Sequence, residues 1–191
     1  IKTAVNDVFV INDTIWASTV NGIAYANINN SLPIQSTWSN FVVANSILKR
    51  NTTNCISYFD SRVLIGSDSG IVSYQNNTLS TYAPLYNGVP VEDGVYRMVV
   101  SGDNLYFSTF TNYGEYRGNF RIFKVNRSNI NNAELLQSGT EVNSLKVDLA
   151  GDLLIGTVNS GVNVYRNNTN NFVIPNGPYS NLNLDISVDN S

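Results

Sequence analysis

The sequence predicts an all-β fold, and three observations point to it. Short apolar runs of strand length are separated by Asn, Asp and Gly, which tight turns favour. Helical periodicity is weak, and the one stretch with a helical pattern, residues 128–137, is short. One string also recurs, and its clearest copy, residues 148–165, reads as strand, tight turn, strand, short loop and strand. The chain is therefore expected to be a series of similar antiparallel sheets.

The repeat has the period of a propeller blade. Its other copies occupy residues 14–25, 62–74 and, in degenerate form, 104–109 continued at 119–125. The hydroxyl residues that end the second strand of each copy lie 48, 42 and 48 residues apart: Thr19, Ser67, Thr109 and Thr157. Four-stranded propeller blades have about 40 to 50 residues. The sequence thus predicts a β-propeller with four complete four-stranded antiparallel blades.

The first two blades are expected at about residues 5–50 and 54–94. The strands of blade one are predicted at residues 8–11, 15–19, 23–28 and 37–43, with a tight Asn12-Asp13 turn after the first. The strands of blade two are predicted at residues 55–59, 63–67, 71–74 and 79–82. A long loop containing Pro and Gly, residues 83–94, is expected to lead out of blade two.

Blades three and four are expected at about residues 95–141 and 142–181. The strands of blade three are predicted at residues 96–100, 105–109, 120–125 and 134–137, with an enlarged loop at 110–119. The strands of blade four are predicted at residues 145–147, 153–157, 162–166 and 172–174. Residues 182–191 resemble the first strand of a fifth blade. A piece of a larger propeller is therefore favoured over a closed ring of four blades.

Composition excludes several classes of chemistry. Charged residues make up 13% of the chain and its net charge is −3, with eleven scattered Lys and Arg, so no nucleic-acid partner is expected. No apolar run reaches the length of a membrane helix, so no membrane insertion is expected for this segment. Histidine is absent, which excludes His-based acid–base catalysis, Ser-His-Asp and Cys-His nucleophiles and His-ligated zinc.

Neither a metal nor another cofactor is expected. The Asp residues of 148–152 and 185–189 lack the dense oxygen ligands of a calcium loop and are interpreted as turn formers. The single cysteine, Cys55, allows no disulfide within the chain and is expected to be a small buried residue. The many Asn residues create glycosylation sequons, which we interpret as turn chemistry in an Asn-rich chain.

The strings at residues 152–165 and 14–25 resemble the two-component regulator propeller repeat. That pattern consists of an Asp/Gly turn, Leu-Trp-Ile-Gly-Thr, a short Asn/Gly loop, Gly-Leu and an aromatic residue. Trp16 holds the tryptophan position in blade one, whereas the other blades have Leu64, Tyr106 and Leu154 there. The resemblance covers essentially the whole chain, with blade three as the poorest copy.

The resemblance implies an exported, non-catalytic recognition module. Such repeats are typical of Bacteroidetes-type bacteria and build the periplasmic sensors of hybrid histidine kinases. Related propellers occur in accessory proteins of the type IX secretion system and in other secreted or cell-surface proteins. A location in the periplasm, at the outer-membrane surface or outside the cell is therefore implied. The shared motif is structural, so it carries over no binding residue.

Topology gives a hypothesis for a recognition surface. In a four-stranded antiparallel blade, the loop between the second and third strands and the connection to the next blade emerge on the same face. The two long segments 83–94 and 110–119 would then meet there. Their aromatic and charged residues suit a protein partner or an oligosaccharide: Tyr86, Glu92, Asp93, Tyr113, Glu115, Tyr116 and Arg117. The alternative is a solvated insertion without a ligand.

Three function classes follow. The first is an exported propeller that binds another envelope or secreted protein, or a ligand, in a cell-envelope or type IX secretion assembly. The second is the periplasmic glycan-sensing domain of a hybrid two-component histidine kinase. The third, with the least support, is a carbohydrate-active enzyme that uses a carboxylate pair drawn from Glu92, Asp93 and Glu115.

Overall fold

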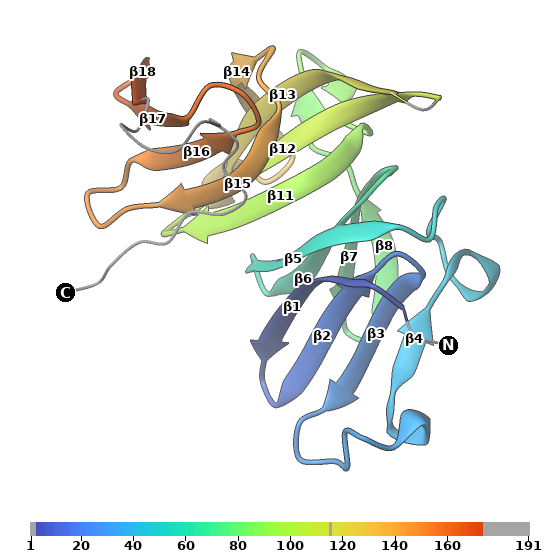
Figure 1. The fold of residues 1–191 in the computed structure, drawn as a ribbon. Coiled ribbons are helices and arrows are strands. Elements are labelled where there is room, and N and C mark those ends of the chain that lie inside the picture. The colour runs from blue at the N-terminus through green and yellow to red at the C-terminus, as the bar shows by residue number, and fades with distance from the viewer. Residues whose placement is uncertain (1–2, 115, 174–191) are drawn as a thin grey trace. The chain divides into compact units, whose positions relative to one another are not determined.

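The computed structural model describes residues 3–114 and 116–173, and these residues form an all-β structure (Figure 1). Four sheets of four antiparallel strands account for most of it, and in each sheet the strands lie side by side in the order of the sequence. Within the described ranges no helix is long and apolar enough to cross a membrane. The four predicted blades are thus present, each as a four-stranded meander.

The strand bounds are close to those predicted. Blade one has β1 (Val5–Ile11), β2 (Thr14–Thr19), β3 (Gly22–Asn27) and β4 (Ser39–Phe41). Blade two has β5 (Thr53–Phe59), β6 (Arg62–Ser67), β7 (Gly70–Gln75) and β8 (Thr78–Tyr82). Blade three has β11 (Gly94–Ser101), β12 (Asn104–Tyr113), β13 (Tyr116–Asn126) and β14 (Ala133–Ser138). Blade four has β15 (Val142–Val147), β16 (Leu153–Thr157), β17 (Val162–Arg166) and β18 (Thr169–Val173).

Three segments differ from expectation. Residues 110–119 are not a loop, because β12 and β13 continue through them as a hairpin. Residues 83–94 contain a short two-stranded sheet, β9 (Leu85–Tyr86) and β10 (Val89–Pro90). The outer strand of blade one is only three residues long, between the 3-10 turns η1 (Gln35–Thr37) and η2 (Val43–Asn45). The strand predicted at 134–137 is confirmed as part of β14, which follows a 3-10 turn, η3 (Arg127–Asn129). The expected fifth-blade strand lies outside the described residues.

The chain divides into two compact units, which we describe separately. Unit 1 comprises the residues up to 83 together with 90–95, and it contains blades one and two. Unit 2 comprises residues 84–89 and the chain from 96 onward, and it contains blades three and four.

Unit 1 is held together by a core between its two sheets. The buried residues are Trp16, Ile23, Leu48, Ile56, Val63, Ile65 and Val72. The Trp16 ring stacks on Tyr25 with centroids 4.7 Å apart and meets the edge of Tyr74 at 4.9 Å. A single sheet could not bury these side chains, so each blade supplies the cover for the other. Cys55 is buried in the same unit, as expected.

Unit 2 has an equivalent core. Ile122 of blade three packs with four residues of blade four: Val142, Leu145, Leu153 and Ile155. Within blade three, the fully buried rings of Phe107 and Phe123 stack with centroids 5.5 Å apart. In blade three, Tyr106 and Lys124 form the cross-strand pair that corresponds to Trp16 and Tyr25 in blade one, so this blade lacks the stacked ring pair and matches the repeat pattern poorly.

Asparagine residues form the tight turns. At Asn12-Asp13, Asn76-Asn77 and Asn167-Asn168 both residues have positive φ, between 46° and 61°. This is the geometry that two-residue hairpins require and that Asn tolerates best. In two of these turns a Tyr hydroxyl from the preceding strand donates to the second Asn, at 3.0 Å in each case. The sequons at these positions are therefore explained by turn geometry.

Candidate functional site

A hydroxyl group closes the loop between the second and third strands in three blades. The side chain of Thr19 donates to the Gly22 carbonyl at 2.8 Å, and that of Ser67 donates to Gly70 at 3.0 Å. Thr157 donates to the Gly161 carbonyl at 2.8 Å. In each loop a backbone amide also donates to the hydroxyl, at 3.0, 3.2 and 2.9 Å. The repeated hydroxyl is thus a structural residue in blades one, two and four.

Thr109 occupies the same position in blade three, but its hydroxyl is left without this role. The β12–β13 hairpin continues to the pair Tyr113↔Tyr116. No short loop therefore follows Thr109 directly, as one does in the other three blades. The register shifts between Thr109 and Thr111, where Asn119 and Phe120 on β13 lie opposite the single residue Phe110 on β12, and Phe110 is itself buried. The Thr109 side chain is 2% exposed, and its Oγ1 atom has no hydrogen-bond partner among the described residues.

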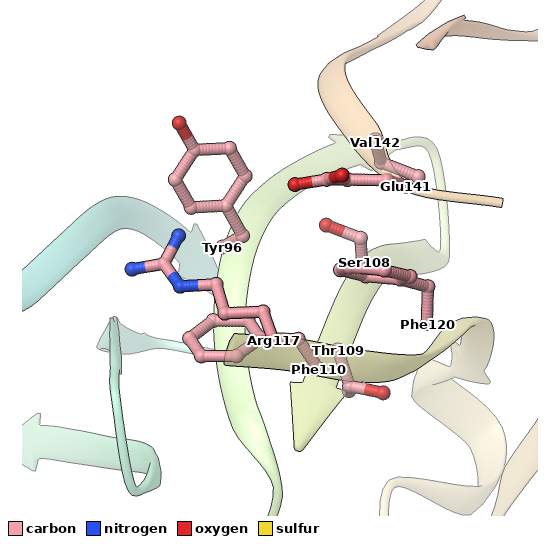
Figure 2. A pocket seen from close by; sticks show the side chains of 8 residues that line it. All are labelled: Tyr96, Ser108, Thr109, Phe110, Arg117, Phe120, Glu141 and Val142. Carbon is pink, nitrogen blue, oxygen red and sulfur yellow. The ribbon is translucent and has the colours of Figure 1, made fainter. Parts of the chain in front are cut away.

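Thr109 lines a small cavity in unit 2. The cavity has a volume of about 10 Å³. Its walls come from β11, β12, β13 and the start of β15: Tyr96, Ser108, Thr109, Phe110, Arg117, Phe120, Glu141 and Val142. Figure 2 shows Tyr96, Arg117 and Phe110 gathered on one side and Glu141 and Phe120 on the other. The loops of blade three and the connection into blade four therefore meet here.

Arginine and aromatic side chains form one wall of the cavity. The Arg117 guanidinium carbon lies 4.3 Å from the ring centre of Phe110 and 5.3 Å from that of Tyr96. On Tyr96, the Arg97 guanidinium carbon lies 3.9 Å from the ring centre, and its Nε donates to the Asn143 carbonyl at 2.6 Å. These cation–π contacts hold the guanidinium groups in defined orientations.

A wider recess of about 260 Å³ adjoins the small cavity, because both share Phe120 and Glu141. Its other walls belong to the connection between β14 and β15 and to the loop between β16 and β17: Gly139, Thr140, Thr157, Val158, Asn159 and Ser160. The predicted rule that these two kinds of connection emerge on one face therefore holds within unit 2. Together, the cavity and the recess are the candidate site.

Among the predicted recognition residues whose side chains the structure describes, Arg117 is the one found in the candidate site. Tyr116 precedes it on β13 and is 76% exposed. Tyr86, in unit 2, packs edge-on against Phe123 with centroids 5.5 Å apart. Glu92 and Asp93 belong to unit 1, where Glu92 pairs with Lys49 at 3.4 Å.

The remaining two predicted residues are described only in part. The backbone of Tyr113 pairs with Tyr116, and its side chain lies outside what the structure describes. Glu115 lies outside the described residues altogether. The carboxylate pair proposed for an enzyme stays a prediction.

Sequence reasoning missed Thr109, Tyr96, Phe110 and Glu141. The available signal was the alignment of Thr109 with three loop-closing hydroxyls, combined with a longer insertion after it. Glu141 was missed because the sequence argument used the connection into blade three, whereas the recess uses the connection out of it.

The Asp148–Asp152 segment is a turn, as expected. Asp148 accepts hydrogen bonds from the amides of Ala150 and Asp152, both at 2.9 Å. The Asp152 carboxylate pairs with Arg166, whose hydrogen bond lowers the pKa of that carboxyl. Residues 3–114 and 116–173 contain no group of three or more Cys, Asp or Glu placed to hold a metal ion.

No family model and no curated protein matches the chain. Solved structures do. Two structures of the extracellular domain of BT4673 from B. thetaiotaomicron, described as a hybrid two-component system in one and as a one-component system in the other, align at TM-scores of 0.78 and 0.77 with 20% and 17% identity. Each alignment covers 99% of this chain and 25% of the other, so the chain spans about a quarter of their length.

A more distant likeness is to regucalcin, a calcium-binding protein from Agrobacterium tumefaciens. It aligns at a TM-score of 0.60 with 14% identity, over 84% of this chain and 53% of that one. At these identities the likenesses show the fold alone. Together with the four meander sheets, they show that the chain has the fold of a β-propeller.

Proposed function

We propose that the chain is part of the extracytoplasmic sensing propeller of a hybrid two-component system, and that it recognises an oligosaccharide. The observation that carries this proposal is the alignment of 99% of the chain with the extracellular domain of such a system. It supports the glycan-sensing alternative better than the binding module of a secretion assembly. The type IX secretion role finds no support in these structures.

The candidate site in unit 2 supports recognition at this position. It combines aromatic rings, an oriented guanidinium, a carboxylate and a buried hydroxyl on a rigid pair of sheets, which is how loops on a scaffold build binding sites. Rings and hydrogen-bonding groups of both kinds are what a polyhydroxylated ligand requires, since its C–H faces stack and its hydroxyls donate and accept.

The gene that encodes the chain tests the proposal most directly. We expect it to encode a membrane-spanning helix and a histidine-kinase module after the propeller. A secretion-sorting domain in that place would contradict the proposal and favour the secretion assembly. Deletion of the gene should abolish the transcriptional response to one class of oligosaccharide and leave the responses to other carbon sources intact.

The location has its own test. Protease added to spheroplasts should digest the propeller, whereas protection until the inner membrane is lysed would show that it faces the cytoplasm. Binding to another envelope protein, the other class expected from the sequence, predicts capture of a stoichiometric partner from the native envelope. Recovery of the propeller alone would count against that class.

A further inference from the structure

We infer that the recess in unit 2 binds one unit of a neutral oligosaccharide, and that Glu141 recognises this unit by accepting hydrogen bonds from two adjacent hydroxyl groups of the sugar. This inference rests on the proposed function and specifies both the class of sugar and the residue that distinguishes it. A sugar unit that carries its own carboxylate should be rejected.

The junction between two blades is closed in unit 1 by a threonine that unit 2 lacks. The Thr53 hydroxyl accepts a hydrogen bond from the Thr19 amide at 2.9 Å and donates to the carbonyls of Thr19 and Gly22 at 3.1 and 2.9 Å. These bonds join the β2–β3 loop to the next blade. Val142 holds the same position in blade four, because each is the first paired residue of its inner strand. Val142 has no hydroxyl, and the cavity and the recess occupy this junction in unit 2.

Glu141 is exposed at the recess and has a carboxylate without a partner among the described residues. The structure describes three Glu side chains, and the other two, Glu92 and Glu134, each pair with a lysine, at 3.4 and 3.2 Å. Figure 2 shows the Glu141 side chain extending from the segment before β15 across the cavity toward Tyr96. Within the part of the chain that is described, this carboxylate is therefore available to a ligand.

The other walls of the recess suit a sugar. Phe120 is half-buried and forms an apolar wall, against which the C–H face of a sugar ring can pack. Asn159 and Ser160, on the loop between β16 and β17, are exposed and add an amide and a hydroxyl, which both donate and accept hydrogen bonds. An ionised carboxylate accepts at both of its oxygens, so Glu141 matches two adjacent sugar hydroxyls.

The size and charge of the recess narrow the ligand further. Its volume of about 260 Å³ is slightly below that of pockets for drug-sized ligands, which start at roughly 300 Å³, so it suits one sugar unit. Glu141 is the charged residue among those that line the recess, and it would repel an anionic unit. A cationic unit would meet Arg117 in the adjoining cavity. A neutral unit avoids both repulsions.

The probes are cellotetraose, maltotetraose and mannotetraose, each in its neutral form and with its primary C6 hydroxyls oxidised to carboxylates. Each is titrated into the full chain by isothermal calorimetry. Glu141→Gln keeps the size of the side chain and removes its charge, and Asn159→Ala removes a second wall of the recess. Glu134→Gln is the matched control, because it makes the same change at a glutamate of unit 2 that does not line the recess.

We expect at least one neutral tetrasaccharide to bind. Glu141→Gln should weaken its binding about ten- to hundredfold, the effect of a hydrogen bond to a charged group. Asn159→Ala should weaken it about three- to tenfold, and Glu134→Gln should leave it unchanged. The oxidised form should bind wild type at least about tenfold more weakly than the neutral form, and Glu141→Gln should bind that oxidised form more tightly than wild type does. General damage to the fold would not produce this gain.

Three results would overturn the inference. If a neutral tetrasaccharide binds Glu141→Gln or Asn159→Ala as tightly as wild type, or if Glu134→Gln loses as much affinity as Glu141→Gln, glycan recognition stands and the role of the recess fails. The same follows if the oxidised form binds wild type as tightly as the neutral form. If none of the probes binds, the recess is not a site for neutral sugars, and the sensor assignment is judged separately, by the gene and by the transcriptional response.

Discussion

Valine substitutions at Thr157 and Thr109 should change the stability of unit 2 in opposite directions. The two residues occupy the same repeat position, in blades four and three, and both are buried. The substitution preserves shape and β-branching, so it removes little besides the hydroxyl. The comparison therefore isolates what the hydroxyl does at each position.

The magnitudes follow from the hydrogen bonds. Thr157 makes two through its hydroxyl, to the Gly161 carbonyl at 2.8 Å and from the Ser160 amide at 2.9 Å. At roughly 0.5–1.5 kcal/mol each, their loss should lower the free energy of unfolding by about 1–3 kcal/mol. The Thr109 hydroxyl makes none, so replacing it by a methyl group should raise the free energy of unfolding by about 1 kcal/mol.

Urea unfolding followed by far-UV circular dichroism measures the difference, expected at about 2–4 kcal/mol between the two variants. Tryptophan fluorescence is an internal control, because both tryptophans, Trp16 and Trp38, lie in unit 1 and should report an unchanged transition. If Thr109→Val lost as much stability as Thr157→Val, the Thr109 hydroxyl would have a partner and the reasoning about the site would be refuted.

Three further predictions concern the blades themselves. Trp16→Ala should destabilise unit 1 by about 3–5 kcal/mol in urea unfolding, because it empties the centre of the aromatic core; a loss below 1 kcal/mol would contradict that packing. Gly22→Ala should lower the free energy of unfolding by about 2–5 kcal/mol, because φ is +101° and the new Cβ would lie 2.2 Å from the Phe41 carbonyl oxygen. Gly88→Ala is the control, because φ there is +78° but no atom lies within 4 Å of the new Cβ; it should lower the free energy of unfolding by about 1–2 kcal/mol. Equal losses of stability for Gly22→Ala and Gly88→Ala would refute the steric argument. The bond from Arg166 lowers the pKa of Asp152 below its ordinary 3.8, so the stability from that pair is present at neutral pH and is lost as the pH falls through the lowered pKa. Asp152→Asn should remove this part of the acid-induced loss, and an unchanged pH profile of unfolding would show that the pair contributes nothing.

Most of the fold could be predicted from the sequence because the repeat is a local signal. Turn dipeptides such as Asn12-Asp13 and alternating apolar residues mark strands without knowledge of distant contacts. The segment 110–119 was misread because Gly114 and Gly118 lie within it and suggest a loop. In fact the hairpin needs a glycine at its tip, where Gly114 has φ +67°. Asn87-Gly88 is likewise a tight-turn signal, and the β9–β10 pair could have been predicted from it.

The site could be predicted only in part, because it depends on what is missing from one repeat. Arg117 was found because Arg on a long loop is a common recognition residue. In the sequence Thr109 is one more copy of a structural position, and only the structure shows that its hydroxyl lacks the loop hydrogen bonds made in the other three blades. Glu141 stands alone between two blades, and nothing in its neighbourhood along the chain marks it.

The meander order of the strands has a consequence for synthesis. Every sheet is complete once about forty consecutive residues have left the ribosome, so hydrogen bonding can keep pace with elongation. Side-chain burial cannot, because the Trp16 face of the first sheet, which ends at Phe41, stays uncovered until the strands that begin at Thr53 have been made. During that interval the nascent polypeptide exposes an aromatic surface, and a chaperone or export factor that shields such surfaces would act in this window.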